Sequence, residues 1–164
     1  MRKIILLISS VLIISIMACS STTEGETVVQ DNGVEITKSN VSVSMKEWDV
    51  NVDPNYKMGK HIKPGQLTLT LVNDGMLEHN LVLLNNAVHE DLALTTEGTM
   101  ADESKLDILG KIEGLKPGET GELVIEDLPA GTYAFICNTA GHYSEGMVYK
   151  FISCLLYTSD AADE

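Results

Sequence analysis

The sequence predicts an all-β protein, a two-sheet Greek-key β-sandwich with one short helical insertion. Three observations support this prediction. About seven or eight short apolar segments occur within roughly 120 residues, a spacing typical of sandwiches. Residues 66–71 alternate strictly between polar and apolar side chains, as a half-buried strand does. Turn-forming stretches such as Asn73-Asp74-Gly75 and Lys116-Pro117-Gly118 separate the segments.

The chain begins with a segment that has the order of an export signal. Two basic residues, Arg2 and Lys3, precede an apolar run from Ile4 to Met17. A run of this length is too short to span a bilayer comfortably, and small residues follow it. We therefore expect residues 1–18 to be a signal peptide.

Cys19 directly follows the sequence Ile-Met-Ala, which resembles the bacterial lipobox. Its thiol is therefore expected to carry lipid and to anchor the protein to a membrane of the bacterial cell envelope, facing the periplasm or the exterior. Ordinary signal cleavage, which would leave a free cysteine, is the alternative. Residues 19–33 are rich in Ser, Thr, Glu and Gly, so they are expected to form a flexible tether.

The β-sandwich is expected to occupy residues 34–153. Its strands are predicted at 34–37, 41–50, 66–72, 76–84, 121–126, 131–137 and 147–152. Residues 85–115 interrupt this pattern as an insertion, in which the stretch from Thr99 to Gly110 has the features of a capped short helix. Trp48, the only tryptophan, is assigned to core or sheet-face packing.

The last residues, 154–164, fit neither a strand nor a helix. They resemble the translation of a transposase adapter used in sequencing libraries, so a non-native tail is expected. Without the signal peptide and this tail, nine basic and 21 acidic side chains remain, giving a net charge of −12. Such an acidic chain is not expected to bind nucleic acid, because phosphates are bound by Lys and Arg.

Setting aside the lipid-bearing cysteine and the tail leaves Cys137 unpaired in an oxidising compartment. A bound metal would protect such a thiol. His142 and Met147 follow it at intervals of five residues, and His79 lies in a predicted strand that could pass the same end of the sandwich. One thiolate, two imidazoles and a thioether are the donors typical of a mononuclear copper site with an axial Met.

Each donor alone has a simpler explanation. Met147 could fill the core, His79 could be a satisfied strand residue, and Cys137 could be a small buried apolar residue. Their joint occurrence in this order favours a metal site. His61 and His89 lack a motif context and are assigned to the surface.

Four motifs give the sequence a family resemblance: Glu78-His79-Asn80, Leu115 to Gly118, Leu128 to Tyr133, and Cys137 to Met147. In these motifs the chain resembles the cupredoxins, the small blue-copper proteins of the plastocyanin and azurin superfamily. The resemblance covers residues 34–151. It implies one type 1 copper ion, bound in a plane by His79, Cys137 and His142 with Met147 as the axial ligand.

The resemblance also implies roles for residues that surround the ligands. The side chain of Asn80 would hold the ligand loop, while its amide and that of Thr139 would point at the thiolate sulfur. The carbonyl of Glu78 could approach the copper from the other axial side. These contacts would tune the reduction potential.

The expected function is that of an electron carrier and not an enzyme. The coordination set is filled, and no Ser-His-Asp or paired-carboxylate arrangement stands out. The protein is expected to be a monomer that shuttles single electrons between protein partners such as a cytochrome or an oxidase. His142 is expected to be the ligand nearest solvent, within an apolar rim of Ala140, Tyr143 and Met76. A copper-binding chaperone or storage lipoprotein is the alternative.

Overall fold

The computed structural model describes residues 26–29, 35–56, 61–86 and 89–154. Within these ranges it contains nine strands and one short 3-10 helix. The predicted signal peptide, Cys19 and the tail beyond Cys154 lie outside the described residues. In the described part of the chain, no helix is long and apolar enough to cross a membrane.

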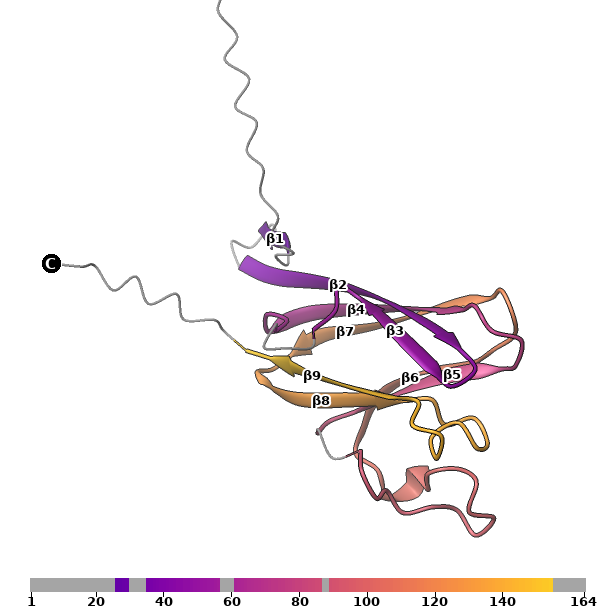
Figure 1. The fold of residues 1–164 in the computed structure, drawn as a ribbon. Coiled ribbons are helices and arrows are strands. Elements are labelled where there is room, and N and C mark those ends of the chain that lie inside the picture. Colours follow the sequence, from indigo (N-terminus) through magenta and orange to yellow (C-terminus); the bar gives the residue numbers. More distant parts are fainter. Residues whose placement is uncertain (1–25, 30–34, 57–60, 87–88, 155–164) are drawn as a thin grey trace, which may run out of the picture.

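Two sheets face each other across a common core (Figure 1). The first has the order β1 (Glu26–Val29), β2 (Glu35–Lys46), β4 (Gly65–Asn73) and β7 (Thr120–Leu128), with β3 (Asp49–Asp53) also paired to β2. The second has the order β6 (Ile108–Leu115), β5 (His79–Leu84), β8 (Gly131–Ile136) and β9 (Val148–Ser153). Strands β2 and β4 are parallel, and the other pairs are antiparallel. The all-β, two-sheet prediction is confirmed.

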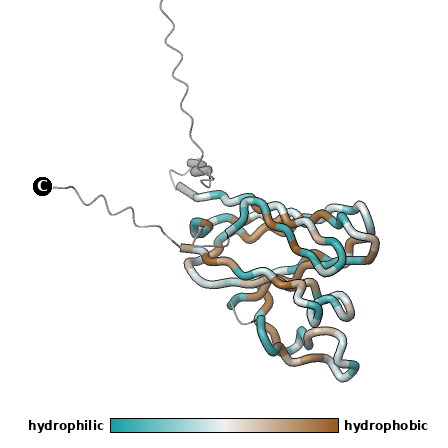
Figure 2. The backbone as a smooth tube through the Cα atoms, in the orientation of Figure 1, coloured by the Kyte–Doolittle hydropathy of each residue, from teal (hydrophilic) through white to brown (hydrophobic). Residues whose placement is uncertain are grey.

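The sheets pack through alternate side chains of their strands. In β4, Leu67, Leu69 and Leu71 are buried, whereas the residues between them are partly exposed. Leu83 and Phe135 of the other sheet belong to the same buried cluster. Figure 2 shows apolar stretches along the strands and hydrophilic stretches in many of the turns. Each of these buried side chains contributes about 1.5–3 kcal/mol of hydrophobic stabilisation, which makes the sandwich a firm support for the loops at its ends.

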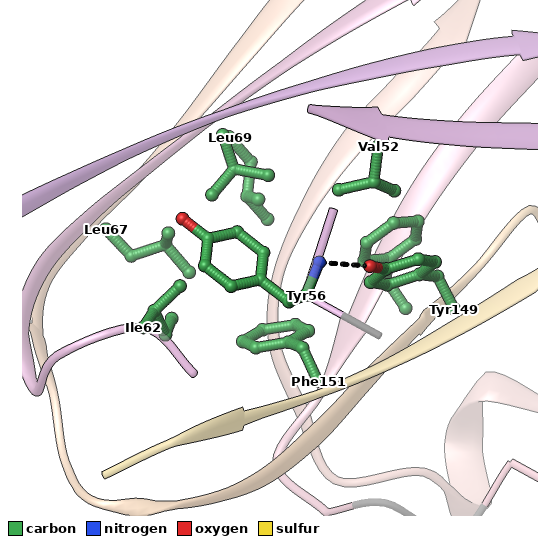
Figure 3. A pocket seen from close by; sticks show the side chains of 9 residues that line it. Val52, Tyr56, Ile62, Leu67, Leu69, Tyr149 and Phe151 are labelled. Atoms are coloured by element: carbon green, nitrogen blue, oxygen red, sulfur yellow. Dashed lines mark hydrogen bonds between the residues drawn. The ribbon is translucent and has the colours of Figure 1, made fainter. Parts of the chain in front are cut away.

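The segment after β3 is fixed against the core by two tyrosines. The ring of Tyr56 lies among Ile62, Leu67 and Phe151 (Figure 3). The backbone N–H of Tyr56 donates to the hydroxyl of Tyr149 at 2.8 Å. Burial raises the pKa of Tyr56. This arrangement closes the core beside β3 and β9.

Two expectations for the first sheet differ from the structure. The predicted strand 41–50 is two strands, because the chain turns at Glu47 and Trp48. The buried residues are odd-numbered up to Met45 but even-numbered at Val52. This shift in the alternation is a feature of the sequence that indicates the turn. In addition, β1 lies within residues 19–33, where a flexible tether was predicted, so the first strand begins before residue 34.

The prediction of a helix ending at Gly110 is wrong. Only Glu103–Lys105 forms a 3-10 helix, with Asp102 as its N-cap accepting a hydrogen bond from Ser104 N. From Ile108 the chain forms β6, since pairing with β5 satisfies its backbone groups. A Cβ at Gly110 would lie 2.7 Å from a Leu123 methyl group, so glycine allows β6 to approach the other sheet closely.

Candidate metal centre

The three strongest predicted ligands come from two neighbouring strands and one loop. His79 is the first residue of β5, and Cys137 follows the last residue of β8. These strands are antiparallel neighbours, with Val82 opposite Ile136, so the start of β5 and the end of β8 lie at the same end of the sheet. His142 belongs to the ligand loop, defined here as residues 137–147, which joins β8 to β9.

The donor atoms of these residues form a compact triangle. The Nδ1 atoms of His79 and His142 are 3.1 Å apart, and Cys137 Sγ lies 3.6 Å from the first and 3.4 Å from the second. All three side chains are buried. A point about 2 Å from all three atoms lies within this triangle, close to the bond lengths of about 2.0–2.3 Å that imidazole and thiolate ligands make to a first-row metal ion.

Backbone hydrogen bonds fix the ligand loop around this triangle. Cys137 N donates to Met147 O at 2.9 Å, and Met147 N donates to His142 O at 3.2 Å. His142 N in turn donates to Thr139 O at 2.9 Å. Gly141 has a φ of 85°, which favours glycine at this turn. The predicted axial ligand, Met147, is therefore held next to Cys137 and is fully buried.

The surroundings favour neutral imidazoles. Burial, and secondarily His142, lower the pKa of His79, while Glu47 opposes the shift. Burial also lowers the pKa of His142, again against Glu47. A neutral imidazole has a free lone pair, which is the form that binds a metal. Soft sulfur combined with two neutral nitrogens fits a copper ion better than magnesium or calcium, which prefer oxygen ligands.

These shifts predict a pH dependence for the metal-free protein. Both histidines have a lower pKa in the folded state, so the unfolded chain binds protons at a higher pH than the folded chain does. The free energy of unfolding is therefore expected to fall as the pH drops below about 6.5, by at most about 1.4 kcal/mol per pH unit for each histidine. Urea denaturation between about pH 7.5 and 5.5 measures this slope. A variant with His79 and His142 replaced by glutamine should show a flatter dependence, and equal slopes would contradict the prediction.

Comparison with known protein families shows the family to which the chain belongs. The model of the sulfocyanin (SoxE) domain matches residues 12–159, most of the sequence. The chain belongs to the sulfocyanin domain family. A comparison with curated proteins finds no match.

Solved structures show that this sulfocyanin-family chain has the cupredoxin fold. A dithionite-reduced auracyanin from Roseiflexus castenholzii superposes with a TM-score of 0.54 at 20% identity, covering 71% of this chain and 97% of that one. Rusticyanin from Thiobacillus ferrooxidans has a TM-score of 0.53 at 18% identity, covering 71% and 77%. Auracyanin A from Chloroflexus aurantiacus, described as a blue copper protein, has a TM-score of 0.50 at 21% identity, covering 71% and 99%.

In the sulfocyanin-family structure, the environment is seen for the side chains of three residues that were predicted to surround the ligands. Asn80 Oδ1 accepts a hydrogen bond from Asn138 N at 2.6 Å, which links its side chain to the ligand loop. Thr139 Oγ1 is buried without a hydrogen-bond partner among the described residues. The Glu78 side chain lies over Gly114, where a Cβ would collide with it. The contacts predicted for the Glu78 carbonyl and for the two amides near the sulfur stay predictions.

Sequence reasoning missed the role of Trp48. The assignment of Trp48 to core or sheet-face packing is wrong, because the side chain is 55% exposed. Its ring makes an edge contact with the His142 ring, with 5.3 Å between centroids and 74° between planes. Its φ is 65°, a left-handed conformation that is unusual for a bulky residue. His142 is only 2% exposed, so Trp48 covers the ligand that was expected to lie nearest solvent.

The predicted apolar rim is only partly exposed. Met76 is 85% exposed and Ala140 is also exposed. Tyr143, however, donates a hydrogen bond to His89 O at 2.7 Å and accepts one from Leu92 N at 3.0 Å. Its hydroxyl therefore joins the ligand loop to the insertion between β5 and β6.

Proposed function

We propose that this chain is a mononuclear type 1 copper protein that shuttles single electrons between redox partners at the cell envelope. The observation that carries the proposal is the buried triangle of His79 Nδ1, Cys137 Sγ and His142 Nδ1. Bound copper would supply the one-electron redox change. The family match and the cupredoxin fold support this function, since auracyanin A, a structural neighbour with this fold, is described as a blue copper protein.

The protein's own residues would keep the donor atoms in place as the charge changes. His79 is held by the pairing of β5 with β6 and β8. The ligand loop is braced by Gly141 N, which donates to Thr99 O at 2.7 Å, and by the side chain of Asn138. A donor set that moves little lowers the barrier to electron transfer. This favours a carrier and not an enzyme.

An apolar surface beside His142 would serve as the contact with the redox partner. Trp48, Met76 and Leu77 are all exposed, by 55%, 85% and 48%. The backbone of Met76 and Leu77 is hydrogen-bonded to Glu47, the neighbour of Trp48 in sequence, so the three side chains share one end of the sandwich. The partner would be a cytochrome or an oxidase, and the net charge of −12 on residues 19–153 favours a basic one.

The remaining parts of the proposal concern location. Cys19 would carry the lipid that holds the protein at the membrane, with the domain facing the periplasm or the exterior as a monomer. Mass spectrometry of the protein purified from membranes would test the anchor. A mass increase by a diacylglyceryl group on Cys19 supports it, and an unmodified amino terminus at this residue contradicts it.

A visible spectrum tests the copper proposal. Protein loaded with copper(II) is expected to show an intense thiolate-to-copper band that bleaches on reduction and returns on oxidation. A colourless copper complex would instead favour a copper-binding chaperone or storage lipoprotein. The buried positions of the three donors favour the carrier, because a delivery protein needs ligands that a partner can reach.

A further inference from the structure

The outer nitrogen of His79 is a buried polar atom that the copper proposal does not use. His79 turns Nδ1 toward Cys137 and His142, which leaves Nε2 on the opposite edge of the ring. This Nε2 is buried and has no hydrogen-bond partner among the described residues. When Nδ1 binds a metal, the proton of the neutral imidazole must lie on Nε2, and such a proton is ordinarily donated to a carboxylate, carbonyl or water.

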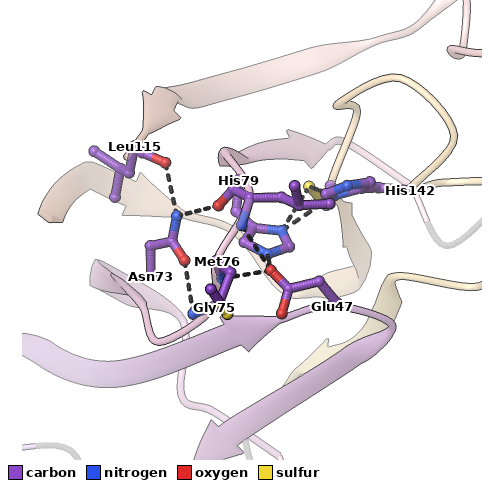
Figure 4. A network of polar contacts seen from close by, with 9 residues as sticks. Glu47, Asn73, Gly75, Met76, His79, Leu115 and His142 are labelled. Carbon is purple, nitrogen blue, oxygen red and sulfur yellow. Dashed lines mark hydrogen bonds and ion pairs between the residues drawn. The ribbon is translucent and has the colours of Figure 1, made fainter. Parts of the chain in front are cut away.

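Glu47 supplies a carboxylate at this edge. Its Oε1 lies 3.9 Å from His79 Nε2 (Figure 4). This separation is longer than a hydrogen bond of about 2.7–3.2 Å, so a shift of roughly 1 Å would form one. The side chain of Glu47 is 28% exposed and that of His79 is fully buried. The carboxylate therefore lies between solvent and the ligand.

The position of Glu47 is fixed by the loop that precedes His79. Its Oε1 accepts hydrogen bonds from Met76 N at 2.5 Å and from Leu77 N at 2.7 Å. The same loop is held from the other side by Asn73, whose Nδ2 donates to Leu77 O at 2.8 Å. Figure 4 shows these contacts converging on the loop. Glu47 thus belongs to an ordered network and is not a free surface carboxylate.

Gly75 has no side chain to fill the space between the Glu47 carboxylate and the His79 imidazole. A Cβ at this position would lie 2.7 Å from Glu47 Oε1 and 3.0 Å from His79 Nε2. Any larger residue would therefore separate the carboxylate from the imidazole. Hydrogen bonds from its own backbone N–H and from those of Leu77 and Met76 lower the pKa of the Glu47 carboxyl, so it carries a negative charge at neutral pH.

We propose that Glu47 is a positioning residue of the metal centre, whose carboxylate accepts the Nε2–H of His79 and thereby keeps Nδ1 turned toward Cys137 and His142. This inference rests on the proposed function. The negative charge would also favour copper(II) over copper(I), because the oxidised ion carries one more positive charge. Glu47 should therefore lower the reduction potential as well as orient the ligand.

Two variants separate orientation from charge. Glu47→Gln keeps an oxygen for Met76 N and Leu77 N but removes the charge, whereas Glu47→Ala removes both. Asp49→Asn is the matched control, because it removes one charge from an exposed position two residues away. Zinc(II) is the probe for affinity, since it binds the same donors without redox chemistry. The His79 Nε2–H signal in the NMR spectrum of the zinc form reports the hydrogen bond directly.

The expected results are specific to Glu47. Glu47→Ala should weaken zinc binding about 10- to 100-fold and lose the protected Nε2–H signal, while Asp49→Asn should keep both within about twofold of the unmodified protein. With copper, Glu47→Gln should raise the reduction potential more than Asp49→Asn does. Equal zinc affinity in Glu47→Ala and Asp49→Asn, or an unchanged Nε2–H signal in Glu47→Ala, would overturn the proposal. If the unmodified protein shows no thiolate-to-copper band, the proposed function fails instead, so the two failures are distinguishable.

Discussion

Replacing Cys137 by serine is expected to abolish the intense visible band of the copper(II)-loaded protein. The band arises from charge transfer out of a thiolate, and Cys137 Sγ is the sulfur that lies 3.4 Å from one imidazole nitrogen and 3.6 Å from the other. A serine hydroxyl stays protonated at neutral pH and is a harder donor, so it cannot replace the thiolate for copper(I). Reversible one-electron chemistry at a potential useful to protein partners should disappear together with the colour.

The second described free cysteine provides the control. Cys154 is partly exposed, and its backbone N–H donates to Ile62 O at 3.0 Å, beyond the end of β9 that is remote from the ligand loop. Cys154→Ser should therefore keep the band at full intensity. Absorbance of the two variants at equal copper content, together with near-UV circular dichroism to show that each is folded, decides the matter. A persistent band in Cys137→Ser would remove this residue from the ligand set.

The sequence was sufficient to predict that His79, Cys137 and His142 lie together, because the chemistry of a metal site depends on residue type and order. Cys137 and His142 are close in sequence, so one loop brings them together. His79 is 58 residues away from Cys137, and a β-sandwich was needed to bring it to the same place. The alternation in residues 66–71 and the turn residues predicted that sandwich, so fold and site supported each other.

Glu47 and Trp48 could not be found in the same way. Neither belongs to a motif, and both act through contacts made by a turn that the sequence analysis had read as strand. Placing Glu47 near His79 requires the pairing of Lys46 with Asp49 and the conformation of the loop at Met76 and Leu77. An exposed tryptophan also contradicts the usual expectation that the only tryptophan of a domain is buried.

The insertion shows another reason why local sequence did not predict the structure. The sequence predicted a capped helix starting near Thr99, whereas in the structure Asp102 is the N-cap and the 3-10 helix ends after Lys105. From Ile108 onward, pairing of the backbone with β5 outweighed the predicted helical propensity and completed the second sheet. The insertion also lies beside the ligand loop (Figure 1), where its backbone accepts hydrogen bonds from Gly141 N and from the Tyr143 hydroxyl. Its role in bracing the ligand loop depends on these tertiary contacts.

Replacing Asn138 by alanine is expected to destabilise the protein strongly while leaving every predicted donor atom in place. The side chain is fully buried directly after Cys137. Its Oδ1 accepts from Ala101 N at 2.8 Å, and its Nδ2 donates to Ala101 O at 3.1 Å and to Glu103 Oε1 at 2.9 Å. Truncation would leave the buried backbone groups of Ala101 without partners, at a cost of about 2–4 kcal/mol in the free energy of unfolding of the metal-free protein.

The effect of Asn138→Ala should extend to the metal centre, because the same side chain ties the insertion to the ligand loop. Once this tie is lost, His142 and Cys137 are free to change their separation as the charge on a bound metal changes, so electron self-exchange should slow while the visible band persists. Asn85→Ala is the control, since Asn85 also donates to an acidic residue of the insertion, Asp107, at 2.9 Å but is exposed. It should change the stability by no more than about 0.5 kcal/mol. Equal losses in the two variants, measured by urea denaturation, would show that the insertion does not brace the ligand loop through Asn138.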